Sequence, residues 1–101
     1  MPDIEIPFSP IMARKALAGQ KCATTRSEPK GNPGDVFEIR GFWFRLLDVK
    51  RVTLTWVRNE AFRLEGFESP EKFENMWRDL HDGRFLVDRE YFIHFFVGCE
   101  R

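Results

Sequence analysis

The sequence predicts an α+β fold, in which a small and mostly antiparallel sheet or barrel carries attached helices. The first observation is that strand-like segments outnumber helical ones, without the regular alternation of a doubly wound parallel sheet. The second is the length of 101 residues, which is typical of one domain, residues 1–101. A core of this size needs large side chains, and 15% of the residues are aromatic. We therefore expect one domain around a single core.

The first part of the chain reads as strand, helix and strand. Residues 3–8 alternate polar and apolar side chains, which predicts a short strand. A helix is predicted over 9–19, because Ser9 fits its N-cap and Gly19 fits the position just past its end. Residues 21–27 form the next predicted strand.

A loop and two strands are expected in the middle of the chain. Residues 27–35 hold two prolines and two glycines, which is typical of a loop. Residues 35–54 follow as two strands or as one long bent strand, with Gly41 at a break or a bulge.

Two helices and one strand complete the predicted order. A short helix is expected over 55–67, with Thr55 as its N-cap. Residues 91–99 are apolar on both faces, as expected of a central strand. The helix over 69–83 has the strongest signal in the chain. Apolar residues of the 69–83 helix recur at i, i+3, i+4 and i+7, which predicts a buried stripe rather than a ligand site. They are Phe73, Met76, Trp77 and Leu80.

The charge pattern argues against a globally basic nucleic-acid binder, because the formal net charge is zero. Basic residues nevertheless predominate over 9–34 and 40–58, and acidic ones over 60–82. A neutral protein can still present one positive face. Ordinary solvated charge is the alternative interpretation.

Other classes of site lack their usual signatures. The chain has no Gly-rich phosphate loop, no nucleophilic-serine elbow and no paired histidines, and we interpret His81 and His94 as structural. We predict no metal site, because the two cysteines show no ligand spacing. Few cysteines, the lack of a signal peptide and the lack of a membrane-spanning apolar run predict a soluble cytoplasmic domain.

Candidate chemistry is concentrated in the stretch LAGQKCATTR. If residues 22–27 form a regular strand, Thr24 and Arg26 share one of its faces. Lys21 has the opposite parity from Thr24 along the chain. Its long side chain can still approach Thr24, because Gly19 allows backbone conformations that other residues rarely adopt. A desolvated lysine of lowered pKa can accept a threonine proton, and a carboxylic acid can protonate a leaving nitrogen. The alternative is a β-branched strand with a surface lysine and a salt-bridged arginine.

The same stretch resembles the opening motif of the ASCH domain family, which belongs to the PUA-like superfamily. That motif, G-x-K-x-x-[E/T]-x-R, is matched here by Gly19, Lys21, Thr24 and Arg26. NPGDVFEI, LEGFESPEKFENMW and YFIHFF resemble the later segments of the family, in order. The resemblance covers nearly the whole chain and implies a small PUA-like antiparallel β-barrel with flanking helices.

Within that family the chain is most similar to the small bacterial N4-acetylcytidine amidohydrolases, which use a Lys, a Thr and a Glu. The resemblance implies that Lys21 is the base, Thr24 the nucleophile and Glu65 the acid, with no cofactor. Glu65 begins the EGF segment, whereas Glu74 belongs to the helix beyond the motif. Cys22 and Ala23 stand where these amidohydrolases usually have Thr or a β-branched residue, and this difference bears on substrate choice more than on fold.

The resemblance also implies which residues hold the substrate and which partners to expect. Arg26 would anchor the base, a phosphate or the carboxylate network, and Phe8 would stack on the base. The implied partner is a modified nucleoside or RNA, with no membrane and no obligate protein partner. The alternative function is an RNA-binding ASCH module without turnover, with or without ribonuclease activity. Nuclease activity has the least support, because no metal carboxylate cluster is visible.

Overall fold

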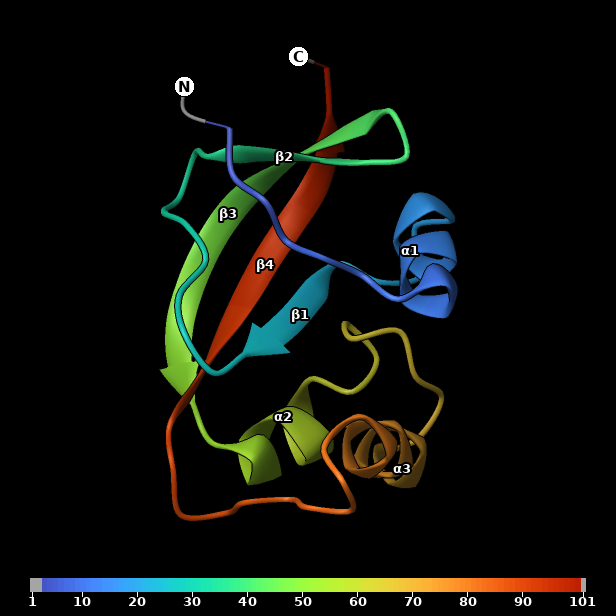
Figure 1. Cartoon of the computed structure of the whole chain (residues 1–101), viewed down its shortest axis with the longest axis vertical. Coiled ribbons are helices and arrows are strands. Elements are labelled where there is room, and N and C mark those ends of the chain that lie inside the picture. The colour runs from blue at the N-terminus through green and yellow to red at the C-terminus, as the bar shows by residue number, and fades with distance from the viewer. Residues whose placement is uncertain (1–2, 101) are drawn as a thin grey trace.

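The computed structural model describes residues 3–100, so residues 1, 2 and 101 of the predicted domain lie outside it (Figure 1). Within residues 3–100, three helices and four strands follow one another in an α+β arrangement, as predicted. In chain order they are α1 (Pro10–Leu17), β1 (Ala23–Arg26), β2 (Val36–Ile39), β3 (Phe42–Val52), α2 (Leu54–Glu60), α3 (Pro70–Leu80) and β4 (Tyr91–Cys99).

The four strands form one antiparallel sheet in the order β1-β4-β3-β2. The last strand is therefore central, as predicted, and β1 lies at an edge of the sheet. The break predicted at Gly41 is a tight hairpin turn, in which Arg40 and Gly41 have φ values of 50° and 87°. The bulge lies elsewhere, in β3 between Leu46 and Asp48, where its register with β4 shifts.

The strand predicted over 3–8 is not formed. Asp3 makes an isolated parallel bridge to Val36, and the residues after it are irregular. Pro7 has no N–H to donate, so it cannot continue a ladder. The alternating pattern instead reflects which side chains are buried: Ile6 lies in the core, and Phe8 is half-buried against it.

Capping side chains locate the helix starts. Ser9 and Ser69 cap α1 and α3 as predicted, each accepting a backbone N–H three residues on. The α2 prediction is wrong by two residues at its start, because Thr53 caps the helix and not Thr55. This helix ends at Glu60, and residues 61–66 form turns instead. The earlier start places Leu54 in the core with no exposed surface.

The predicted stripe of α3 is only partly buried. Phe73 and Trp77 are buried and Met76 is half-buried, whereas Leu80 is 62% exposed. Leu80 is the last residue of the helix and lies at the wall of the cavity described below, where no further turn covers it.

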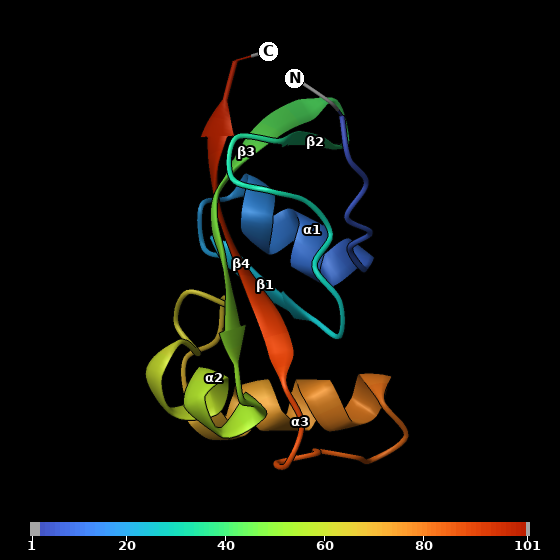
Figure 2. The same cartoon turned by 90° about the vertical axis from the view of Figure 1, so that its left-hand side faces the viewer.

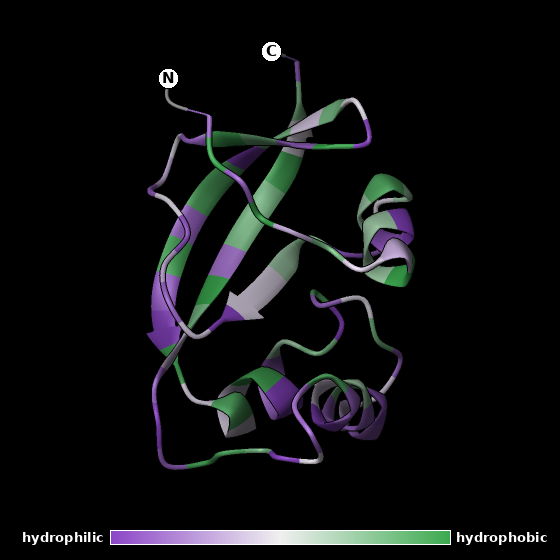
Figure 3. Cartoon of the chain, viewed as in Figure 1, coloured by the Kyte–Doolittle hydropathy of each residue, from purple (hydrophilic) through white to green (hydrophobic). Residues whose placement is uncertain are grey.

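Buried apolar side chains gather in two clusters rather than in the single expected core. One lies between α1 and the sheet, and the other lies where α2 and α3 pack at one end of it (Figure 1 and Figure 2). β4 contributes side chains to both clusters, Phe96 to the first and Ile93 to the second. Figure 3 shows hydrophobic residues, in green, along β3 and β4, as expected of strands that lie between or beside the two clusters. Within residues 3–100, no helix is long and apolar enough to cross a bilayer.

Candidate functional site

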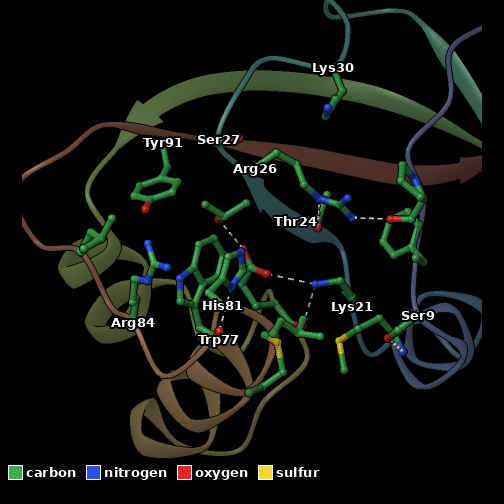
Figure 4. Close-up of a pocket in the computed structure, with 18 of the residues that line it drawn as sticks. Ser9, Lys21, Thr24, Arg26, Ser27, Lys30, Trp77, His81, Arg84 and Tyr91 are labelled. Carbon is green, nitrogen blue, oxygen red and sulfur yellow. Dashed lines mark hydrogen bonds and ion pairs between the residues drawn. The ribbon is translucent and has the colours of Figure 1, made fainter.

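A cavity of about 710 Å³ opens beside the edge strand β1 (Figure 4). Its walls come from the segment before α1, from β1, from the turn after α2, from α3 and from the loop that leads into β4. This volume is in the range of small-molecule sites. The five residues predicted to act on or hold a substrate all line it. They are Phe8, Lys21, Thr24, Arg26 and Glu65.

The centre of the site is a buried ion pair between Lys21 and Glu65. The Lys21 ammonium donates to Glu65 Oε1 at 3.0 Å and to the Glu65 carbonyl oxygen at 3.0 Å. Both side chains are 3% exposed. Burial lowers the pKa of Lys21 below its ordinary value, although the Glu65 carboxylate opposes the shift. Lys21 can therefore give up its proton at a lower cost than a solvated lysine.

Backbone contacts hold Glu65 against β1. The N–H groups of Cys22 and Ala23 donate to the carbonyl oxygen of Leu64 at 2.8 and 3.0 Å. Gly66 then turns the chain with a φ of 98°, which a side chain rarely adopts. A Cβ on Gly66 would also stand 3.3 Å from the Lys21 Cβ. The glycine thus lets the loop approach the lysine closely.

The second oxygen of Glu65 is bound by Thr25, which the sequence reasoning did not select. Thr25 Oγ1 donates to Glu65 Oε2 at 2.7 Å, and Thr25 is buried. A signal for this contact was present, because Lys21 and Thr25 have the same parity along the chain. Both carboxylate oxygens of Glu65 are thereby oriented, one by a cation and one by a hydroxyl.

Thr24 has a different environment from Thr25. Its Oγ1 accepts a hydrogen bond from Arg26 Nε at 3.2 Å. The Arg26 guanidinium also donates to the carbonyl oxygen of Pro7 at 2.7 Å. In the described part of the chain, Lys21 makes no hydrogen bond to Thr24 and the Thr24 hydroxyl proton has no acceptor. A charged donor on Oγ1 favours negative charge there.

Phe8 lines the cavity but is packed on several sides. Its ring is nearly parallel to that of Phe37, with centroids 6.1 Å apart, and meets the edge of Phe96. The Arg26 guanidinium carbon lies 5.2 Å from the Phe8 centroid. Phe8 and Arg26 therefore form one unit at this wall.

The opposite end of the cavity was not anticipated from the sequence. The rings of Trp77 and His81 are stacked on the wall that leads to it, with centroids 4.2 Å apart. Arg84 and Tyr91 lie at this opposite end in Figure 4, away from Lys21. The i, i+4 spacing of Trp77 and His81 is a signal for this pair, although the apolar stripe of residues 69–83 predicts Trp77 only as a buried core residue.

Glu74 has a structural role, in ion pairs with two arginines. The Glu74 carboxylate binds Arg58 at 2.6 Å and Arg78 at 2.8 Å, which joins α2 to α3 outside the cavity.

Among residues 3–100, no three His, Cys, Asp or Glu side chains are grouped so that they could hold a metal ion.

His94 fastens β1 and the following loop to β4. It is fully buried, its Nδ1 lies 3.2 Å from the Thr24 carbonyl oxygen, and its Nε2 accepts from the Lys30 N–H at 2.9 Å. A neutral ring with its proton on Nδ1 satisfies both contacts. Burial lowers the pKa of His94, so the neutral form is favoured.

His94 should make the protein less stable in mild acid. An unfolded histidine gains a proton near about pH 6.5, while the folded His94 gains one only at lower pH. The contribution of His94 to the free energy of unfolding should therefore be constant above that pH and fall below it, by up to about 1.4 kcal/mol per pH unit. Urea unfolding of wild type and His94→Gln at pH 7.5 and 5.5 measures this. Equal pH dependence in both proteins would contradict the prediction.

Comparison with known proteins identifies the fold. No protein-family model matches the sequence, and no curated protein matches it. The solved ASCH domain from Lactobacillus crispatus JV V101 is similar in structure, with a TM-score of 0.65 and 16% identity over 87% of this chain and 70% of that chain. Hypothetical protein PH0355 has a TM-score of 0.69 and 15% identity over 91% and 94% of the two chains. Protein EF3133 from Enterococcus faecalis V583 has a TM-score of 0.60 and 17% identity over 87% and 69%.

These neighbours confirm the predicted fold class. The curled antiparallel sheet with three helices is an ASCH-like, PUA-like fold. At these identities the similarity concerns the fold alone, and chemistry has to be argued from the residues of the cavity.

Proposed function

We propose that the protein is an amidohydrolase that removes an acyl group from N4-acetylcytidine or a related modified nucleoside. The observation that carries the proposal is the buried ion pair between Lys21 and Glu65, which faces the same cavity as Thr24. A base, a nucleophile and an acid are thereby grouped in one partly enclosed space. The motif shared with the amidohydrolases supports the same three roles.

The first step is a proton transfer within the ion pair. Lys21 gives one proton to Glu65 across the 3.0 Å contact, which leaves a neutral amine and a carboxylic acid. Burial favours this state, because it disfavours the two separate charges. The amine is now a base and the acid is now a proton donor.

The Lys21 amine and the Glu65 carboxylic acid then both take part in acyl transfer. The Lys21 amine takes the hydroxyl proton of Thr24 as Oγ1 attacks the acetyl carbonyl carbon, and Arg26 stabilises the charge on Oγ1. The bond from that carbon to N4 breaks, and Glu65 gives its proton to N4. Cytidine leaves, and the acetyl group remains as an ester on Thr24.

Water completes the cycle. The Glu65 carboxylate accepts a proton from water as the water oxygen attacks the ester, and the Lys21 ammonium returns a proton to Thr24 Oγ1. Acetic acid is released, and the ion pair forms again when the proton on Glu65 returns to Lys21. In this scheme Thr25 positions Glu65, because its hydroxyl holds Oε2.

A direct assay tests the proposal. Wild-type protein is incubated with N4-acetylcytidine, and cytidine and acetate are followed by chromatography. We expect equimolar release of the two products, because hydrolysis of one amide yields one of each. N4-methylcytidine is the matched control, since it has no acyl carbonyl to attack. The absence of release from N4-acetylcytidine at high protein concentration would contradict the proposal.

A second candidate function is an RNA-binding module without turnover. The basic side chains of the cavity wall favour it, because they offer contacts to phosphates. Such a module would bind single-stranded RNA with an affinity that falls steeply with salt, and Thr24→Ala would not weaken binding. Cytidine release by wild type would decide in favour of the enzyme.

A further inference from the structure

We infer that the far end of the cavity is a phosphate subsite, formed by Arg84 and Arg89, and that the substrate is a phosphate-bearing acylated nucleoside. Both side chains line the cavity that contains Lys21 and Glu65. Neither forms an ion pair or a side-chain hydrogen bond with another described residue. Other basic residues do form such pairs, for example Arg58 and Arg78 with Glu74.

The cavity is more positive than the protein around it. Its wall contains five basic and two acidic side chains, although the whole chain has a net charge of zero. Glu65 is already neutralised by Lys21, and Asp82 is the one acidic side chain that the far end contributes among the described residues. A cleft of one sign concentrates ligands of the other sign. An uncharged nucleoside would make no use of these cations.

The geometry of the substrate places a phosphate at this end. This step rests on the proposed function, which brings the acylated N4 to Thr24. In cytidine, N4 and the sugar lie on opposite sides of the pyrimidine ring. With N4 near Thr24 and Lys21, the sugar and its phosphate extend away from them, toward the end where Figure 4 shows Arg84 and Tyr91.

The wall between the two ends suits a nucleotide. The stacked rings of Trp77 and His81 lie there and can pack against a base or a sugar. Beyond them, Arg89 lies over the Tyr91 ring at 5.2 Å, which holds one cation in place without neutralising it. Arginine binds phosphate oxygens through two parallel N–H groups. The phosphate belongs either to a mononucleotide or to a strand.

Binding to a variant that does not turn over separates this inference from the catalytic one. Calorimetry on Thr24→Val measures Kd for N4-acetylcytidine, for its 5′-monophosphate and for a short single-stranded RNA with one N4-acetylcytidine. We expect the monophosphate to bind at least about tenfold more tightly than the nucleoside, as charged hydrogen bonds to phosphate suggest. Adding Arg84→Gln and Arg89→Gln together should reduce this ratio toward one.

A matched control removes a charge elsewhere. Arg14→Gln changes an exposed cation of α1 that does not line the cavity, and it should keep the ratio. Equal Kd values for nucleoside and monophosphate would overturn the inference. So would a ratio that the paired replacements of Arg84 and Arg89 leave unchanged, or that Arg14→Gln lowers equally. Tighter binding of the RNA than of the monophosphate assigns the phosphate to a strand, and equal binding assigns it to a nucleotide.

The proposed function can fail separately from this inference. If wild type releases acetate from none of the three compounds while the binding preference persists, the phosphate subsite stands and the amidohydrolase proposal is wrong. If acetate is released from all three with equal kcat/KM, and the three compounds bind with equal Kd, the reverse holds.

Discussion

Thr24→Ala is expected to lower kcat for N4-acetylcytidine by at least about 10³-fold, as removal of a nucleophile does in related acyl-transfer chemistry. Its hydroxyl lines the cavity, has a charged donor on Oγ1 and has a proton that no described residue accepts. The fold should persist, because the alanine keeps the Cβ and the strand backbone. Steady-state kinetics of cytidine release and thermal unfolding measure the two effects.

Thr25→Val is the matched control for that variant. It removes the neighbouring hydroxyl of the same strand and keeps the side-chain shape. We expect a smaller loss, below about 10²-fold, because Thr25 orients Glu65 and takes no part in bond formation. The pH profile of kcat should shift as well, since Glu65 Oε2 loses its donor. A larger loss in Thr25→Val than in Thr24→Ala would move the nucleophile to Thr25, whose hydroxyl is the one bonded to a carboxylate.

Lys21→Met is expected to destabilise the protein by about 3–5 kcal/mol, which is the usual cost of removing one partner of a buried ion pair. The Glu65 carboxylate would remain 3% exposed without its cation, held only by Thr25. Urea unfolding at pH 7 measures the change. The variant should also lose turnover, because the base is gone.

The double variant Lys21→Met with Glu65→Leu tests the cause of this loss. It should be more stable than Lys21→Met, because no unpaired charge is left in the interior. Arg14→Met is a control for the loss of a cation at the surface and should change stability by less than about 0.5 kcal/mol. A double variant no more stable than Lys21→Met would show that packing, and not the orphaned charge, causes the loss.

Local signals were enough to predict most of the fold. The Ser9 and Ser69 caps act on N–H groups three residues away, so the starts of α1 and α3 could be predicted from short windows. Thr53 and Thr55 both suit an N-cap, and the choice between them depends on where Leu54 is buried, which is a tertiary property. The alternation over residues 3–8 likewise marked burial correctly but not strand pairing, which Pro7 prevents.

The order of the elements from α1 onward, the central position of β4 and a small set of candidate residues around one motif could be predicted from the sequence alone. How those residues meet depends on tertiary packing. Lys21 and Glu65 are 44 positions apart, and their contact depends on how the turn after α2 packs against β1. That packing also pairs Glu65 with Thr25 rather than with Thr24. β1 is an edge strand, so residues from both of its faces line one cavity. Arg84 and Arg89 line the same cavity, and no local pattern in the sequence predicts their role.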